Sequence, residues 1–301
     1  MRFKRLDLNL LVALDALLDE KKTTRAAARL SVSQSAISGM LARLRTYFED
    51  DLLVQVGRNM ELTPLARELA DPVRQLLLQI EATVAIRPAL ALGTERRHFR
   101  ITVSDYAVSI LMVPLIARLQ QEAPYITVEL LPQNEHAGEK LRRGETDLLV
   151  IPEPFLAPDH PHALLFEDTY SCVVWNGNTT VGATLDMATY LGSGHATSQL
   201  GRPRSPTLDE RFLQEQGIRR RICVTTYDFG SMAQIVVGTE LIATMHTRLA
   251  KASQACLPLK LLAPPLAMPT VRVCLQWHHY QDQDPCHRWL RDLLMTVARE
   301  E

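Results

Sequence analysis

The segment TTRAAARLSVSQSAISGMLARLR, residues 23–45, decides how the start of this chain folds. It lies in a run from Lys21 to Phe48 without a single Asp or Glu, although acidic residues slightly outnumber Lys and Arg over the whole chain. Small and apolar residues at helical spacing predict two short helices joined by a tight turn. Thr24 can cap the first helix and Ser33 the second, because both side chains accept hydrogen bonds from free N–H groups.

The second helix is expected to have two unlike faces. Its inward positions are Ala36, Ile37, Met40, Leu41 and Leu44. Its outward positions are Gln34, Ser35, Ser38, Ala42 and Arg43. Gln can pair with an adenine edge, Ser with bases or phosphates, and Arg with guanine or a phosphate, whereas a carboxylate would repel the phosphate backbone. With the alanines at 26–28, which let two helices cross closely, this pattern predicts a DNA-binding helix-turn-helix.

A plain three-helix bundle with a solvated basic face would show the same charge. Such a bundle would not need small residues where two helices cross, a capping Ser at the start of the second helix, or a polar outward face on that helix. Gly39 stands in the middle of the second helix, where it costs about 1 kcal/mol relative to Ala. We expect this glycine to make room for a close contact.

The stretch from residue 23 to 64, with its AAARL, SQSAIS and LRTYFEDDLLVQ blocks and a following TP, resembles the N-terminal signature of LysR-type transcriptional regulators. The opening MRFKRLDLNLLVALDALLDE further resembles the branch that holds the nodulation regulators and the salicylate- and nitroaromatic-responsive regulators. The resemblance implies a winged helix-turn-helix domain, mainly α, over residues 1–62. One departure is Ser35, where many relatives have Pro, although Ser is also compatible with a helix start. The side chains expected to contact double-stranded operator DNA are Thr24, Arg25, Ser33, Gln34, Ser35, Ser38, Arg43 and Arg58.

The segment DLLVQVGRNMELTP, residues 51–64, predicts two short extended runs around a turn at Gly57-Arg58-Asn59. In LysR-type regulators such a hairpin is the wing, which implies that Arg58 reaches the minor groove or its phosphates. An ordinary hairpin with a solvated Arg is the alternative.

Residues 63–86 predict a long helix, because Thr63-Pro64 is a strong start signal. Pro72 is expected to kink or split this helix, since it lacks an N–H and clashes with the preceding turn. A narrow apolar stripe on such a helix needs a partner helix. The resemblance implies the linker helix through which two subunits pair, in a homodimer or homotetramer. The stripe consists of Leu65, Leu69, Val73, Leu76, Leu77, Ile80 and Val84.

Beyond a hinge at 87–97, strands alternate with helices. The predicted strands lie at 99–104, 126–132, 147–151, 170–176, 219–225, 240–245 and 271–277, and the predicted helices at 107–122, 138–143 and 284–301. Such alternation predicts a mostly parallel sheet with helices on both faces. The segment GETDLLV is typical of the LysR effector-binding domain. This resemblance implies an α/β fold over residues 98–301, like that of a type II periplasmic solute-binding protein. Its lobe I would comprise about 98–165 and 268–301, and its lobe II about 166–267.

In such sheets small molecules bind outside the carboxyl ends of strands. Aromatic and polar side chains in the loops that follow the predicted strands would suit a small, flat aromatic effector with a hydroxyl or carboxylate. Each of these side chains could instead be packed structurally. The amino-acid sequence around residues 192–197 departs from the usual family pattern, so the resemblance is weakest there. The residues expected to contact the effector are Ser104, Asp105, Tyr106, Asn134, His195, Thr226, Tyr227 and Phe229.

Composition and motifs exclude several other classes. A net charge of -1 argues against a wholly basic nucleic-acid coat protein. No apolar run approaches a membrane span and the N-terminus lacks a signal-peptide core, so we expect a cytoplasmic location and no membrane partner. Five scattered cysteines predict neither disulfides nor a zinc site.

The sequence has no GxSxG, Gly-rich phosphate loop, HExxH or CxxC motif, so we expect no enzyme activity, no catalytic residue and no cofactor. No metal site is expected either. His160 and His162 flank a rigid Pro, and His278-His279 are predicted to point to opposite faces of a strand.

The sequence therefore predicts a ligand-responsive DNA-binding transcriptional regulator. The resemblance implies an activator of an operon linked to an aromatic compound, with RNA polymerase as a further partner. The alternatives are a cytoplasmic α/β small-molecule-binding protein or enzyme without a transcriptional role, and an exported solute-binding protein. Neither explains residues 1–86. A gel-shift experiment with salt titration separates them, because only a regulator binds duplex DNA saturably.

Overall fold

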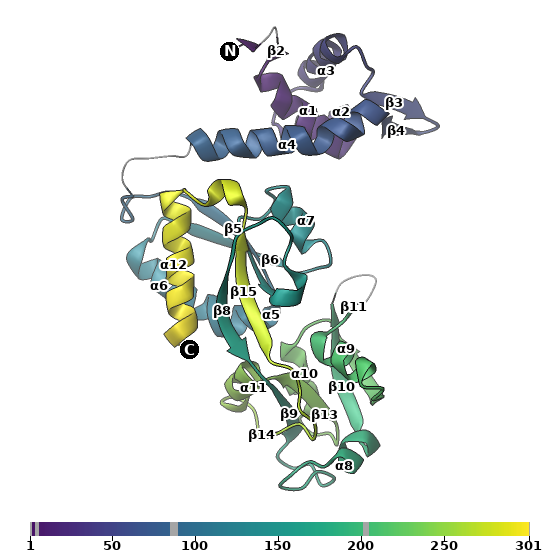
Figure 1. The fold of residues 1–301 in the computed structure, drawn as a ribbon, viewed down its shortest axis with the longest axis vertical. Helices are drawn as coiled ribbons and strands as arrows, with labels where there is room; N and C mark the ends of the chain where they lie inside the picture. The colour runs from purple at the N-terminus through teal and green to yellow at the C-terminus, as the bar shows by residue number, and fades with distance from the viewer. Residues whose placement is uncertain (1, 4–5, 85–89, 201–204, 301) are drawn as a thin grey trace. The chain divides into compact units, whose positions relative to one another are not determined.

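The computed structural model describes residues 2–3, 6–84, 90–200 and 205–300. The chain folds as two compact units, Met1–Ile86 and Arg87–Glu301 (Figure 1). The end of the predicted linker helix at 85–86 and the start of the predicted hinge at 87–89 lie outside the described residues.

The first unit is a helical core with a small hairpin. Its elements are β1 (Arg2–Phe3), β2 (Leu6–Asp7), α1 (Asn9–Glu20), α2 (Thr23–Arg29), α3 (Gln34–Phe48), β3 (Leu53–Val56), β4 (Asn59–Leu62) and α4 (Pro64–Val84). Ala26 and Ala27 of α2 are buried in the same core as Ile37 and Leu44 of α3, so the predicted close crossing of the two helices is present.

One of the two predicted caps is confirmed. The Ser33 hydroxyl accepts a hydrogen bond from the Ala36 N–H at 3.2 Å, at the start of α3. The cap predicted at Thr24 is wrong, because α2 begins at Thr23 and its N-cap, Lys22, makes no side-chain cap. Thr24 is thus a residue of the first helical turn, and its exposed side chain is available for other contacts.

The hairpin β3–β4 is the predicted wing. Val56 pairs with Asn59, so Gly57 and Arg58 form a two-residue turn. Gly57 has a φ of 62°, in the left-handed region that such turns need and that glycine adopts without strain. The wing is held to α3 by Arg45, whose guanidinium donates to the carbonyls of Asp51 at 2.7 Å and Leu53 at 2.8 Å.

Helix α4 starts as predicted, with Thr63 Oγ1 accepting the Ala66 N–H at 3.1 Å. It runs unbroken through Pro72, so the expected split does not occur. Because Pro72 has no N–H, the carbonyl of Glu68 lacks its usual donor. Both residues are exposed, so water can supply the missing hydrogen bond. Ion pairs from Arg74 also hold α4 to α1.

Helix α4 has two apolar faces with different surroundings. One face packs into the core of its own unit through Ala66, Leu69, Ala70, Val73 and Leu77. The other consists of Leu76, Ile80 and Val84, which are 42%, 38% and 78% exposed. Their spacing of four residues places them in one row along the helix.

The second unit begins with lobe I, built on a five-stranded sheet in the order β6-β5-β7-β15-β8. Helices α12 and α6 lie on one side of this sheet and α7 on the other (Figure 1). A π-helical turn, Val108–Met112, lies between α5 and α6. The strands are β5 (His98–Val103), β6 (Thr127–Pro132), β7 (Leu148–Pro152), β8 (His162–Asp168) and β15 (Val271–Trp277). The helices are α5 (Asp105–Ala107), α6 (Val113–Glu122), α7 (Ala137–Arg142) and α12 (Pro285–Glu300), with the 3-10 turns η2 (Glu153–Phe155) and η3 (His279–Gln281).

Lobe II contains a second sheet in the order β11-β10-β13-β9-β14, with β12 paired to β10. Its strands are β9 (Tyr170–Trp175), β10 (Gly194–Leu200), β11 (Ser205–Pro206), β12 (Arg221–Thr226), β13 (Ile242–His246) and β14 (Leu259–Leu262). Its helices are α8 (Met187–Gly192), α9 (Leu208–Glu215), α10 (Gly230–Val236) and α11 (Thr247–Gln254).

The expected mostly parallel sheet is wrong, because both sheets are mixed. β15 runs antiparallel to β7 and β8, and β9 runs antiparallel to β13 and β14. The cause is the two-lobed path of the chain. β8 carries the chain out of lobe I, with the crossing at Thr169, and β15 carries it back, so the two strands lie side by side in opposite directions. Among the described residues, no helix is long and apolar enough to cross a membrane.

Candidate functional site

The outward face of α3 is polar and open, as predicted. Gln34, Ser35, Ser38 and Arg43 are all exposed, and so are Thr24 and Arg25 on α2. Ser33 is exposed too, but its hydroxyl caps α3 and lies 2.9 Å from the hydroxyl of Ser35. Arg58 is exposed at the tip of the wing.

The arginines of the acid-free stretch and the wing divide into two groups. Arg29 pairs with Asp15 at 3.3 Å and Asp19 at 2.8 Å, and Arg45 holds the wing, so these two are used inside the domain. Arg25 and Arg58 are exposed and have no ion pair among the residues that the structure describes.

Arg43 belongs to both groups. It lies on the outward face of α3 and pairs with Asp7 at 3.2 Å. The backbone N–H of Asn9 and the Arg43 guanidinium lower the pKa of the Asp7 carboxyl below its usual range. This exposed pair is weak, so a phosphate can compete with Asp7 for the guanidinium.

Apart from its chain neighbours and the backbone of its own helix, no described atom lies within 4 Å of the position where a Cβ would stand on Gly39. The close contact expected at Gly39 is therefore not made by the described part of this chain. The glycine opens a gap in the middle of the outward face, between exposed Ser38 and Ala42.

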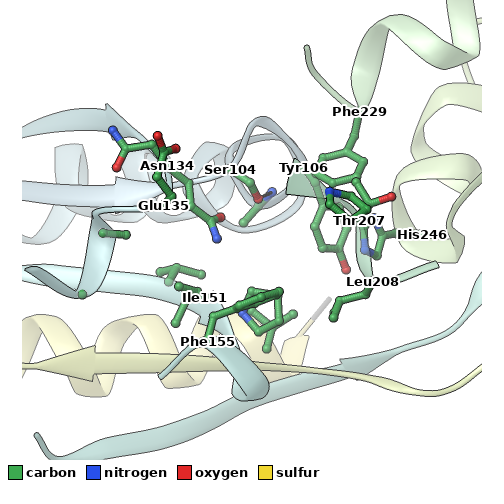
Figure 2. Close-up of a pocket in the computed structure, with 18 of the residues that line it drawn as sticks. Ser104, Tyr106, Asn134, Glu135, Ile151, Phe155, Thr207, Leu208, Phe229 and His246 are labelled. Atoms are coloured by element: carbon green, nitrogen blue, oxygen red, sulfur yellow. Dashed lines mark hydrogen bonds between the residues drawn. The ribbon is translucent and has the colours of Figure 1, made fainter. Parts of the chain in front are cut away.

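A cavity of about 290 Å³ lies between the two lobes of the second unit (Figure 2). Lobe I contributes Ser104 and α5 directly after β5, the loop after β6, and β7 with η2. Lobe II contributes the start of α9, the residue before α10 and the end of β13. The volume is near the lower end of the range for small-molecule sites. The side chains labelled in Figure 2 are Ser104, Tyr106, Asn134, Glu135, Ile151, Phe155, Thr207, Leu208, Phe229 and His246.

Four of the residues predicted to contact an effector line this cavity, namely Ser104, Tyr106, Asn134 and Phe229. The other four do not: they are Asp105, His195, Thr226 and Tyr227. His195 is buried inside β10, where its Nε2 lies 2.7 Å from the Tyr190 carbonyl and burial lowers its pKa to about 4. Thr226 donates to Asp228 at 3.1 Å, and Tyr227 is 85% exposed to solvent. The loop expected around His195 is wrong, because Gly194–Leu200 form strand β10. The other three residues lie in or next to segments that line the cavity, but the direction of a side chain depends on packing.

Sequence reasoning missed several lining residues, among them Phe155, Thr207, Leu208, Arg211 and His246. His246 had a usable signal, because it ends strand β13 and the carboxyl ends of strands form such sites. The segment around Thr207 and Leu208 gave no comparable signal in the sequence.

One wall of the cavity is a stack of rings from both lobes. Tyr106 lies parallel to His246, with ring centroids 4.1 Å apart, and the edge of Phe229 meets the His246 ring at 4.9 Å. Burial lowers the pKa of His246 to about 4, so the ring is neutral at pH 7. Its Nδ1 has no hydrogen-bond partner among the described residues.

Asp105 joins the lobes instead of lining the cavity. Its Oδ2 accepts the N–H groups of Phe229 and Gly230, each at 2.8 Å. Burial raises the pKa of this carboxyl, although the same two hydrogen bonds act to lower it. The contact lies beside the ring stack and depends on the distance between the two lobes.

The reasoning that excluded a metal site at His278-His279 is wrong. Strand β15 ends at Trp277, so the two histidines follow it in a turn and do not point to opposite faces of a strand. His160, His278 and His279 each place one ligand atom within 4.8 Å of the other two.

A winged helix-turn-helix, followed in the chain by a two-lobed α/β unit with an inter-lobe cavity, is the arrangement expected of a DNA-binding regulator that responds to a ligand. The lysR family of bacterial regulatory helix-turn-helix proteins matches residues 8–67, and the LysR substrate binding domain matches residues 92–299. The chain belongs to the LysR family of transcriptional regulators: it is a DNA-binding regulator and not an enzyme.

Similar proteins cover nearly the whole chain. Nodulation protein D of Bradyrhizobium sp. (strain ANU 289) is 42% identical over 99% of this chain and 88% of its own length. A probable transcriptional regulator from Pseudomonas aeruginosa is 28% identical, with a TM-score of 0.65 over 97% of each chain. A full-length OxyR variant from the same organism has a TM-score of 0.72 over 98% of this chain and 95% of its own, at 19% identity.

We expect the buried His246 to make folding stability depend on pH. The ring has a pKa of about 4 when folded and about 6.5 when unfolded. The contribution of His246 to the free energy of unfolding is complete above pH 6.5 and is lost as the pH falls toward 4. The free energy of unfolding should then fall by up to about 1.4 kcal/mol per pH unit. The groups that face the ring are the Asp168 carboxylate and the rings of Tyr106, Tyr170 and Phe229.

The measurement is urea unfolding of the wild type and His246→Leu from pH 7 to pH 5. The variant should lose stability less steeply with falling pH, while His136→Gln, which changes an exposed histidine, should follow the wild type. Equal slopes for His246→Leu and the wild type would contradict this assignment.

Proposed function

We propose that this regulator activates transcription in response to a small aromatic compound with a hydroxyl group. The observation that carries the proposal is the ring-lined cavity between the lobes, together with the unpartnered Nδ1 of neutral His246. A flat ring fits against the walls formed by Phe155 and Tyr106, and a phenolic hydroxyl can supply the hydrogen bond that this nitrogen lacks. The family resemblance supports RNA polymerase as the partner in activation.

The proposed switch is a change in how the lobes meet. A ligand shifts an equilibrium only by its different affinity for the two states, so it must contact parts that move relative to each other. Tyr106 from lobe I and His246 from lobe II both line the cavity. Asp105 bridges the same two lobes through Phe229 and Gly230, so opening the cleft breaks two hydrogen bonds.

The proposed DNA interface is the outward face of α3 with the wing. Gln34 and Ser38 read bases, and Thr24, Arg25, Ser33, Ser35, Arg43 and Arg58 contact the backbone or the minor groove. Gly39 supports close approach, since the outward face has no Cβ at its centre. Because one recognition helix covers few base pairs, specific binding needs two copies on two half-sites. The second copy is proposed to pack on the exposed row of Leu76, Ile80 and Val84, giving a dimer that assembles further to a tetramer.

The DNA interface is tested by Gln34→Ala. Loss of a bidentate contact to a base should relax base preference by about 1–3 kcal/mol at one position. Arg58→Ala should instead lower affinity evenly across sequences and reduce the salt slope by about one unit. Gel-shift titrations against a randomised operator library measure both effects. If Gln34→Ala keeps the wild-type specificity profile, that side chain takes no part in readout.

The dimer is tested by Leu76→Lys combined with Ile80→Lys. Both side chains are partly exposed in the isolated chain, so the variant should fold, and the buried charges should prevent pairing. Leu77 is unsuitable for this test, because it packs on the core of its own unit. Light scattering should give a smaller mass, and binding to two half-sites should be lost. Glu81→Lys, an exposed change on the same helix, is the control. A double variant with unchanged mass would exclude the row of Leu76, Ile80 and Val84 as the dimer interface.

The cavity is tested by Phe155→Ala. Phe155 is 37% exposed and lies under Arg211, so its removal should leave the fold intact. We expect roughly tenfold weaker binding of an aromatic ligand, equivalent to about 1.4 kcal/mol, with unchanged DNA binding in the absence of ligand. Tyr227→Ala is the matched control, because this aromatic side chain points to solvent. Thermal-shift screening with phenols, salicylates, chloroaromatics and flavonoids supplies the ligand. An unaltered response in Phe155→Ala would place the effector elsewhere.

A further inference from the structure

Three histidines from two separate segments meet at one end of lobe I. His160 lies in the loop before β8, and His278 and His279 follow the end of β15. Their ring centroids are 4.5 Å apart for His278 and His279, 4.7 Å for His160 and His278, and 5.6 Å for His160 and His279. Because β8 starts here and leaves for lobe II at its other end, the cluster lies at the end of lobe I away from the crossing.

The loop that carries His160 is fixed in place. Buried Gln276 accepts the Ala157 N–H at 2.9 Å and donates to the Ala157 carbonyl at 2.8 Å and the His160 carbonyl at 3.3 Å. The Trp277 N–H donates to the Pro161 carbonyl at 3.2 Å. These four bonds hold His160 next to the residues that precede His278, so the cluster is built before any ligand arrives.

Two ring nitrogens in the cluster lack the partners that buried polar atoms normally have. His160 Nδ1 and His278 Nε2 are buried and have no hydrogen-bond partner among the described residues. His279 is exposed, which gives a path from solvent. A bound cation would satisfy both nitrogens once each presents its lone pair.

We propose that His160, His278 and His279 form a binding site for a divalent transition metal ion of the zinc type. Neutral imidazole nitrogens suit Zn²⁺, Co²⁺, Ni²⁺ and Cu²⁺ and do not suit Mg²⁺ or Ca²⁺. One ligand atom from each ring already lies within 4.8 Å of the other two. Zn–N bonds of about 2.0–2.1 Å bring such atoms to roughly 3.4 Å, and the exposed His279 ring has room to turn. Water takes the fourth position.

Two charged side chains near His160 have opposite effects on the binding of a cation. Asp159 lies next to His160 and favours a cation, while Arg142 opposes it. His278 Nδ1 accepts the Tyr280 N–H at 3.3 Å, which places the proton of the neutral ring on Nε2. Binding of a metal at Nε2 requires this proton to move to Nδ1, so the ion would replace this long hydrogen bond. The ion would join the segments before β8 and after β15, the two neighbouring strands that connect the lobes.

The test uses the full chain, freed of any histidine tag and of bound metal by chelation. Titration with Co²⁺, followed by visible absorption and by calorimetry, should show one ion per chain in tetrahedral coordination that Zn²⁺ displaces. His279→Gln should weaken binding on the order of 100-fold or more, since loss of mere outer-shell partners costs about 10–100-fold. His136→Gln, at another exposed histidine, should bind as the wild type does.

His279→Gln is at an exposed position and is expected to fold, which far-UV circular dichroism checks. His160→Gln supplies a second, independent removal. The absence of a tetrahedral Co²⁺ spectrum in the wild type would overturn the proposal. So would equal affinity in the wild type, His279→Gln and His160→Gln.

Discussion

The arrangement of the second unit depends on the carboxylate of Asp168. This buried residue ends β8 just before the chain crosses to lobe II. It accepts the Tyr106 hydroxyl at 2.6 Å and the N–H groups of Thr169 at 2.7 Å and Arg248 at 3.2 Å. One side chain thus joins a wall of the cavity, the crossing itself and the start of a helix in lobe II. Burying a carboxylate is costly unless hydrogen bonds replace its water. Tyr106 of lobe I and the adjacent Thr169 supply two of these donors, and the Arg248 N–H of lobe II supplies the third only when both lobes meet in this way.

The hydrogen bonds of Asp168 fix one wall of the cavity in place. Tyr106 is fixed at its hydroxyl by Asp168 and on its face by His246. Asp105, the residue before it, holds the N–H groups at the start of α10. Neighbouring residues of lobe I therefore contact lobe II in different ways, Asp105 through hydrogen bonds and Tyr106 through ring stacking. The space enclosed beyond them is a cavity between the lobes. Tyr106, Phe229 and His246 both line the cavity and take part in these contacts.

The first unit shows how charge is shared between folding and function. Asp15 and Asp19 on α1 pair with Arg29 of α2 and Arg74 of α4, so the same two acids hold both helices. Arg45 holds the wing through backbone carbonyls. The acid-free stretch is thus explained in two ways: some of its basic side chains stabilise the domain, and the others leave an outward face that a phosphate backbone can approach.

The sequence by itself determined the local elements and the order of the domains, because helix caps such as Ser33, apolar periodicity and the LysR-like blocks are properties of short segments. It also indicated some of the segments that border the cavity, those at residues 104–106, Asn134 and Phe229. Only the tertiary structure decided which side chains enter it, since Tyr227 and His246 both stand near strand ends but one faces solvent and the other is buried. The inter-lobe contacts of Asp105 and the meeting of His160 with His278 arise between segments more than 100 residues apart, and the antiparallel pairs of β15 with β8 and of β13 with β9 likewise join segments distant in the sequence. The free energy of such contacts depends on how distant surfaces pack, which no periodicity in the sequence records.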